Sequence, residues 1–169
     1  MELVFAPKGL LQINDARICF RNFRGQAGPF NDEGERSFHL VIPDVETAHR
    51  LLDDKNRYGA SWNVKIKEPQ EEGAAPFIHM PVKVKFTERS APKVYLISGD
   101  NRIELNEDTI DMLDDIEIRS VDLDIRPYDG EARGQAFRSA YLQSIWVVQE
   151  VDRFAARIAS MNEDNDGNY

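Results

Sequence analysis

Short segments in which apolar and polar residues alternate dominate this chain, and glycine, proline and asparagine separate them. Alternation with a period of two is typical of strands in an antiparallel sheet or small barrel, because successive side chains point to opposite faces. We therefore predict a mainly β protein with seven strands. These strands span residues 12–23, 36–42, 62–67, 78–86, 93–97, 116–128 and 137–149.

Helical spacing is found at three places between or after these strands. Asp44 precedes an apolar stripe, which predicts a helix capped by the Asp44 side chain and covering one end or edge of the sheet. A shorter helix is predicted over 107–113, where acidic residues in the first turn suit the helix dipole. A third helix, docked on the barrel, is predicted from the helical spacing of Val151, Phe154, Ala155 and Ile158.

The length of the chain fits one domain with a short tail. A chain of 169 residues, 41% of them hydrophobic, can bury one sizeable core. Residues 161–169 contain three acids and no base, so they cannot bury enough surface to fold alone. We predict one domain over 1–160 and a disordered acidic tail over 161–169.

Several predicted strands place basic residues on the face opposite the apolar one. Lys65 and Lys67 alternate with Trp62, Val64 and Ile66, which are expected to face inward. The strand over 78–86 repeats the pattern with two more outward lysines.

The first predicted strand combines bases and a ring on its outer face. Ile18 and Phe20 are expected to face inward, and Phe23 is expected to face outward beside Arg17 and Arg21. Outward aromatic residues recur beside bases in the later strands.

A strand face that mixes cations with flat rings suits single-stranded nucleic acid, because cations follow the phosphates while rings stack on unpaired bases. The alternative is a solvated face whose charges prevent aggregation at a sheet edge. On the first interpretation the candidate binding residues are Arg17, Arg21, Phe23, Arg24, Arg36, Lys65, Lys67, Lys83, Lys85, Lys93, Tyr95, Arg126, Tyr128 and Tyr141.

The net charge of −9 argues against a protein that coats duplex DNA by bulk positive charge. Most of that charge is local, since residues 100–124 hold ten acids against two arginines, a balance of −8. The protein is therefore predicted to have two faces, and any nucleic-acid site is a local basic patch.

No residue pattern predicts catalysis, a bound metal or a cofactor. His39, His49 and His79 lie far apart in sequence and lack the spacing of zinc ligands or of a catalytic triad. Asp122 and Asp124 share a strand face and, with Asp114 and Asp115 upstream, leave a divalent-metal nuclease open as an alternative, although an exposed acidic face explains the pair more simply.

Cys19 is the sole cysteine, so no intramolecular disulfide can form and a reducing cytoplasm is expected. The N-terminus lacks a basic stretch followed by a sustained apolar one, and no window is long enough to span a membrane. We therefore expect a cytoplasmic protein with no membrane partner.

A family resemblance adds to this picture. It rests on the stretches 21–25, 28–38, 42–44, 62–65, 124–128 and 141–147. In these stretches the chain resembles small phage and prophage proteins that bind single-stranded DNA. The resemblance implies an OB-like barrel and binding of single-stranded DNA during phage replication or recombination in a bacterial host.

The same resemblance implies an acidic tail that recruits replication or recombination proteins. The candidate partner-binding residues are Glu163, Asp164, Asp166 and Tyr169. The tail departs from the family pattern because Gly167 and Asn168 separate the acids from the final ring, which is a tyrosine rather than a phenylalanine. An acidic interaction protein, such as a DNA mimic, remains the second alternative, and a homo-oligomer is left open.

Overall fold

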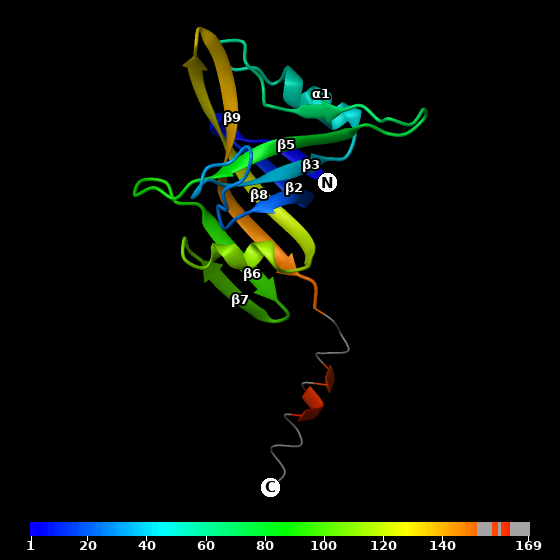
Figure 1. The fold of residues 1–169 in the computed structure, drawn as a ribbon, viewed down its shortest axis with the longest axis vertical. Helices are drawn as coiled ribbons and strands as arrows, with labels where there is room; N and C mark the ends of the chain where they lie inside the picture. The colour runs from blue at the N-terminus through cyan, green and yellow to red at the C-terminus, as the bar shows by residue number, and fades with distance from the viewer. Residues whose placement is uncertain (152–156, 159, 163–169) are drawn as a thin grey trace.

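The computed structural model describes residues 1–151, 157–158 and 160–162. Figure 1 shows a curved sheet with one helix at its upper end and a long β8–β9 hairpin rising beside that helix. The strands are β1 (Glu2–Phe5), β2 (Leu11–Asn22), β3 (Arg36–Ile42), β4 (Lys65–Lys67), β5 (Phe77–Val84), β6 (Lys93–Ser98), β7 (Asn101–Leu105), β8 (Ile118–Ala132) and β9 (Gln135–Gln149). The helices are α1 (Val45–Asp53) and the short 3-10 turns η1 (Pro7–Gly9) and η2 (Ile110–Asp114).

Five strands close into a barrel. Antiparallel pairs join β5 to β3, β3 to β2, β2 to β8 and β8 to β9. A parallel pair between β5 and β9 completes the ring, with Val82 opposite Ala140 and Lys83 opposite Tyr141. This arrangement confirms the predicted OB-like barrel, in which the loops after the first barrel strand and between the last two flank a ligand-binding strand face.

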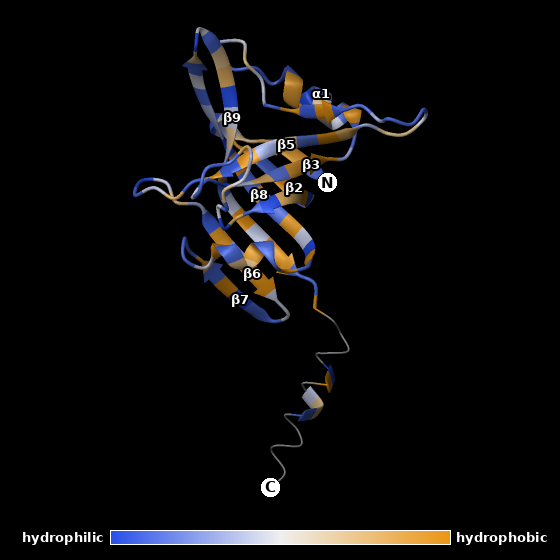
Figure 2. Ribbon diagram, viewed as in Figure 1, coloured by the Kyte–Doolittle hydropathy of each residue, from blue (hydrophilic) through white to orange (hydrophobic). Residues whose placement is uncertain are grey.

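The inner face of the barrel is apolar, as the alternation along the strands requires. Figure 2 shows hydrophobic and hydrophilic residues alternating along β2, β5, β8 and β9. Phe38 and Leu40 of β3 and Met80 and Val82 of β5 have no exposed surface, and Ile145 of β9 is equally buried. These side chains belong to one continuous core.

The seven predicted strands all form, and two further strands were not predicted. β1 and β7 are short edge strands whose side chains are mostly exposed, so their residues carry no clear alternation. The first helix is confirmed together with its cap, since the Asp44 side chain accepts a hydrogen bond of 2.7 Å from the Thr47 amide. The second predicted helix forms as the 3-10 turn η2.

The third predicted helix lies largely outside the described residues, including Phe154 and Ala155. Residues 157–158 and 160–162 are helical, but Ile158 is 50% exposed and Met161 is 64% exposed. The prediction that this helix docks on the barrel rests mainly on residues outside the described ones and stays a prediction.

A bulge in β2 reverses the predicted faces of two phenylalanines. Phe20 adopts a left-handed conformation with a φ of 49°, and the pairing of β2 with β3 shifts between Cys19 and Asn22. Because one extra residue moves the following side chains to the opposite face, Phe20 points outward and is 63% exposed. Phe23 is instead fully buried and stacks on Phe38, so the prediction that it faces outward is wrong.

The edge strand β4 also departs from the prediction. It pairs only with β5, and Ile66 is 43% exposed rather than inward-facing. Trp62 precedes the strand, is buried, and donates a hydrogen bond of 2.9 Å to Asp54. The inward alternation therefore holds at Trp62 but not at Ile66.

One arginine of β9 is buried, three residues after the strand begins at Gln135. Arg138 is 9% exposed, and its guanidinium group makes two hydrogen bonds to the Asp129 carboxylate, at 2.8 and 3.0 Å. It also lies 3.4 Å from Asp54 and packs over the ring of Trp62. Arg138 thus links the hairpin to the segment after α1.

Candidate nucleic-acid interface

A groove crosses the outer face of β3 and β5. The loop over 23–35 borders it on one side and β9 borders it on the other. The side chains that line it and bear on binding are Phe30, Arg36, Ser37, Lys83, Lys85 and Tyr141. Four of these six were predicted from sequence as nucleic-acid-binding residues, and they come from three separate parts of the chain.

Tyr141 is the centre of a cluster of cations and rings at this groove. The Lys83 ammonium lies 5.9 Å from the Tyr141 ring centroid, and the Arg126 guanidinium lies 5.0 Å from it. The Tyr128 ring is 5.4 Å from the Tyr141 ring and is half exposed. Barrel closure explains the cluster, because Tyr141 has Lys83 of β5 on one side and Arg126 of β8 on the other.

Phe30 completes the groove and was not among the predicted residues. Its side chain is fully exposed at the tip of the loop over 23–35. A single aromatic residue within a run rich in Gly, Pro and Asn is the signal that could have identified it. The exposed ring adds apolar surface at the border of the groove.

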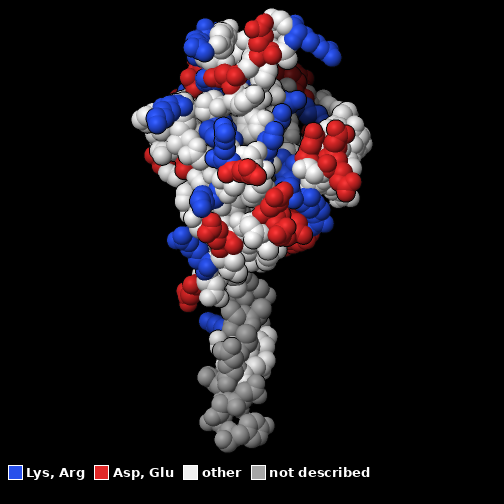
Figure 3. Space-filling view, turned by 90° about the vertical axis from the view of Figure 1, so that its left-hand side faces the viewer, with Lys and Arg blue, Asp and Glu red and all other residues white. Residues whose placement is uncertain are grey.

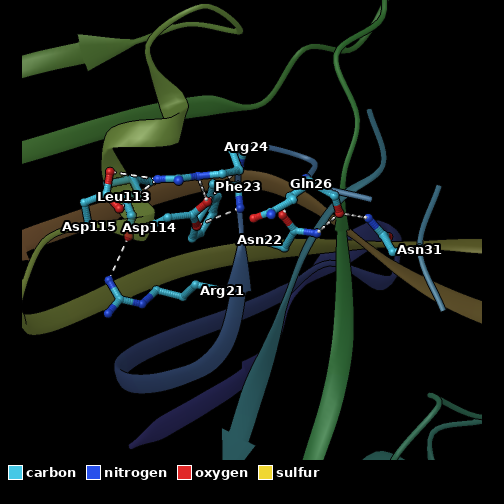
Figure 4. A network of polar contacts seen from close by, with 9 residues as sticks. All are labelled: Arg21, Asn22, Phe23, Arg24, Gln26, Asn31, Leu113, Asp114 and Asp115. Atoms are coloured by element: carbon cyan, nitrogen blue, oxygen red, sulfur yellow. Dashed lines mark hydrogen bonds and ion pairs between the residues drawn. The ribbon is translucent and has the colours of Figure 1, made fainter. Parts of the chain in front are cut away.

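The loop that carries Phe30 has a defined shape. The Asn31 side-chain amide donates hydrogen bonds to the backbone carbonyl groups of Gln26, Asp32 and Glu35. The backbone amide of Gln26 in turn donates a hydrogen bond to the side-chain oxygen of Asn22, as Figure 4 shows. These bonds hold the loop beside the groove.

Arg36 lies at the edge of the groove and is half buried. Its guanidinium group is 3.6 Å from the Glu107 carboxylate and 5.6 Å from the centre of the Phe86 ring. Its Nε is buried, and no hydrogen-bond partner for it exists within the described part of the chain. The Arg36 side chain therefore keeps one unused donor near the groove.

Two of the predicted arginines hold the loop to η2. Arg21 donates hydrogen bonds of 2.7 and 2.8 Å to the carbonyl groups of Leu113 and Ile116. Arg24 forms ion pairs of 3.1 Å with Asp114 and 2.7 Å with Asp115 (Figure 4). The structure gives both side chains an internal structural role and does not bring them to the groove.

Asp114 explains why the chain turns inward at Phe23. Its carboxylate accepts hydrogen bonds from the backbone amides of Phe23, at 2.8 Å, and Arg24, at 3.0 Å. The sequence placed Asp114 in the acidic region and, with Asp115, upstream of the carboxylates considered for a nuclease. It gave no sign of this contact, because the contact joins residues about ninety positions apart.

A second group of rings lies on the same outer face of β3 and β5, at the end next to β4. We call Phe20, His39, Phe77 and His79 the histidine cluster. The Nδ1 atoms of His39 and His79 are 2.7 Å apart, and Phe77 stacks on His79 with ring centroids 4.8 Å apart. Phe20 meets both imidazoles edge-on, at 5.2 and 5.7 Å.

The predicted residues Lys65 and Lys67 flank this cluster, since they pair with His79 and Phe77 across β4 and β5. Both lysines are exposed. Burial lowers the pKa of His39 and of His79, and positive charge on Lys65 lowers both further. Arg17, another predicted residue, lines a neighbouring depression together with Phe77.

Lys93 and Tyr95 lie on β6, away from both the groove and the histidine cluster. Lys93 is 3.5 Å from the Glu104 carboxylate, and Tyr95 stacks on Trp146 with ring centroids 5.8 Å apart. The Arg102 guanidinium lies over the Tyr95 ring, 4.4 Å from its centroid. No hydrogen bond, ion pair or ring contact joins this group to the residues of the groove within the described part of the chain.

The carboxylates considered for a nuclease have structural partners. Asp122 accepts a hydrogen bond of 2.8 Å from the Asp15 amide, and Asp124 accepts one of 2.8 Å from the Ser144 hydroxyl. Within the described residues no group of three or more His, Cys, Asp or Glu side chains is arranged to hold a metal ion. The geometry gives the nuclease alternative no support.

Charges of both signs occur on the face in Figure 3. Several Lys and Arg side chains lie around uncharged surface in the upper half, with some acidic side chains among them, and more acidic side chains gather at the right and below. The residues predicted to bind partners lie outside the described residues and stay predictions; they are Glu163, Asp164, Asp166 and Tyr169.

The closed five-stranded barrel with a cationic and aromatic strand face defines the class, an OB-type ligand-binding domain. Two solved structures have the same fold. A C-terminally truncated single-stranded DNA-binding protein from bacteriophage Enc34 has a TM-score of 0.53 and 14% identity over 89% of this chain and 91% of that one. The same phage protein without the truncation has a TM-score of 0.50 and 19% identity over 90% and 92%.

The family follows from sequence. Residues 2–168 match the family described as "Putative phage ssDNA-binding domain", and the chain belongs to that family. A comparison with curated proteins found no match. Among the described residues no helix is long and apolar enough to cross a membrane.

Proposed function

We propose that the chain binds single-stranded DNA through the groove, without strong sequence preference, and protects it during phage DNA replication or recombination. The observation that carries this proposal is the cluster in which Lys83 and Arg126 flank the Tyr141 ring beside Tyr128. The cations are placed to meet phosphates and the rings to stack on unpaired bases, which every nucleobase can do. Membership of a phage single-stranded DNA-binding family supports the same ligand.

The position of the groove in the fold also supports this function. It lies on the strand face between the loop over 23–35 and the last two barrel strands, where OB-type barrels bind oligonucleotides. Binding, rather than catalysis, is the whole activity that we propose, and we place it in the cytoplasm of the bacterial host.

Binding is expected to favour single-stranded over duplex DNA, because base pairing hides the faces on which rings stack. We expect oligo-dT to bind at least about tenfold more tightly than a duplex of equal length, as one stacked base contributes roughly 1–3 kcal/mol. Fluorescence anisotropy with labelled oligo-dT, a duplex and an RNA of equal length, at two salt concentrations, measures the difference. Equal affinity for oligo-dT and duplex would contradict the proposal, and a preference for RNA would change the ligand.

The tail is proposed to compete with DNA for the groove and to recruit replication proteins. Residues 161–169 carry three acids and no base, and a short tether gives them an effective concentration of roughly millimolar. Deleting 163–169 should therefore tighten oligo-dT binding severalfold at about 20 mM salt but hardly at about 300 mM, where screening is strong. Titrations of full-length and truncated protein side by side measure this. If full-length and truncated protein bind oligo-dT equally at both salt concentrations, the tail does not compete with DNA, and recruitment is the only role left for it.

A further inference from the structure

We propose that the histidine cluster is a second part of the DNA-binding face, and that DNA bound there takes up one proton into the His39–His79 pair. This inference rests on the proposed function and extends it to residues that the sequence did not single out. It makes affinity for single-stranded DNA depend on pH through two named side chains.

The cluster and the groove are parts of one continuous surface. Pro81 lines the groove and pairs with His39, and Ser37, two residues before His39, also lines the groove. Lys83 in the groove and His79 in the cluster are four residues apart on β5, which corresponds to about 13 Å along a strand. A DNA strand that leaves the groove along β5 therefore reaches the cluster.

The cluster presents what an unpaired nucleotide requires. Phe20 is 63% exposed and Phe77 is 38% exposed, so their rings offer apolar surface outside the core. Lys65 and Lys67 are exposed on β4, paired with His79 and Phe77 of β5, so their ammonium groups can contact a phosphate beside the rings. The left-handed conformation of Phe20 holds its ring outward, a costly arrangement for a bulky residue in a strand.

The histidine pair can accept one proton without losing its hydrogen bond. Because the two Nδ1 atoms are 2.7 Å apart, one of them carries a proton and donates a hydrogen bond to the unprotonated Nδ1 of the other ring. The donating ring then has a bare Nε2. A proton that binds this Nε2 turns the donating ring into a cation and makes the hydrogen bond charge-assisted. A second proton would occupy the accepting Nδ1 and break the hydrogen bond.

Several charged groups surround the pair. Lys65 and Lys67 on β4 are nearest in register, and Arg17 and Cys19 approach from β2, with Cys19 directly opposite His39. Burial raises the pKa of the Cys19 thiol, which stays uncharged near neutral pH. Asp15 lines the neighbouring depression beside Arg17 and Phe77.

The sign of the effect follows from these charges. In the free protein, burial and the lysine charges hold the pKa of His39 and of His79 below the ordinary 6.5, so the pair is neutral at neutral pH. A phosphate beside Lys65 offsets the positive charge and raises the pKa of the pair in the complex. The gain in affinity is therefore complete at pH values below the pKa of the pair in the free protein. It is lost as pH rises through the higher pKa of the pair in the complex.

The test compares the wild type with His39→Gln/His79→Gln across pH 5.5 to 8.0, using oligo-dT because thymine does not take up protons in this range. Wild-type affinity should increase about tenfold towards pH 5.5, the effect of one pKa shift of one unit. The double variant should show a much flatter profile. His49→Gln is the matched control, since His49 is the only other histidine and lies exposed on α1.

Calorimetry adds a direct measure of protons. Titration of oligo-dT near pH 6 in two buffers of different ionisation enthalpy should reveal proton uptake by the wild type and by His49→Gln, and little by the double variant. Equal pH profiles for wild type and double variant, or no uptake, would overturn the inference. Weak binding of oligo-dT at pH 8.0, or binding no tighter than to duplex, would instead overturn the proposed function. A thermal melt of each variant confirms folding.

Discussion

Replacing Tyr141 with alanine is expected to weaken oligo-dT binding by about 5- to 150-fold, the equivalent of 1–3 kcal/mol for one stacked base. Tyr141 is the ring that Lys83 and Arg126 flank, and its removal leaves these cations without the surface on which they converge. Fluorescence anisotropy at fixed salt measures the change. Tyr58→Ala is the matched control, because Tyr58 is an exposed tyrosine in the segment after α1.

The salt dependence separates stacking from charge at the same site. Tyr141→Ala should leave the slope of log K against log salt unchanged, because no phosphate contact is lost. Lys83→Ala should flatten the slope by about 0.7, the contribution of one phosphate contact to single strands. Lys55→Ala, an exposed lysine just after α1, should change neither quantity. Wild-type affinity in a folded Tyr141→Ala protein would show that this ring is not a base contact.

Replacing Arg138 with alanine is expected to lower the free energy of unfolding by about 3 kcal/mol. The substitution removes a buried cation from Asp129 and Asp54 and removes its packing over Trp62. Both carboxylates are partly exposed and can take water as a partner, which places the loss at the lower end of the range for broken buried pairs. Urea unfolding followed by tryptophan fluorescence measures it.

Arg89→Ala provides the control for stability, because Arg89 is exposed in the loop after β5 and should change the free energy of unfolding by less than about 0.5 kcal/mol. Acid provides a second readout. The hydrogen bond from Arg138 holds the pKa of Asp129 below its usual value of 3.8. The stabilisation is therefore present above that value and lost as pH falls through the lowered pKa, and Arg138→Ala should remove this loss. A variant as stable as the wild type would show that the pair contributes nothing net.

Period-two alternation predicted the barrel strands well, because a strand with one buried face must show it. It predicted the outward direction of Lys83 and Tyr141 for the same reason. It failed at Phe20 and Phe23, since one residue in a left-handed conformation shifts the register and no local pattern marks where this happens. The bulge can be understood only with the partner strand and the contact from Asp114 in view.

Long-range partners account for the other differences at the site. Arg21 and Arg24 look like surface cations in sequence, yet their acceptors lie about ninety residues further along the chain. The histidine pair joins residues forty positions apart, so the spacing of the histidines gave no sign of it. Ile66 is exposed because β4 is a three-residue edge strand, too short for its alternation to be enforced by packing on both sides.

The parallel closure between β5 and β9 has a consequence for how this protein is made. Lys83 and Tyr141 become neighbours only through that closure, although 58 positions separate them in sequence. Structures dominated by such distant pairings fold slowly, since the entropy of closing long loops is lost before the contacts form. A nascent chain therefore cannot assemble the groove until nearly all of the barrel has been synthesised. We expect that truncations ending before β9 expose the apolar inner face and are substrates for chaperones rather than weak DNA binders.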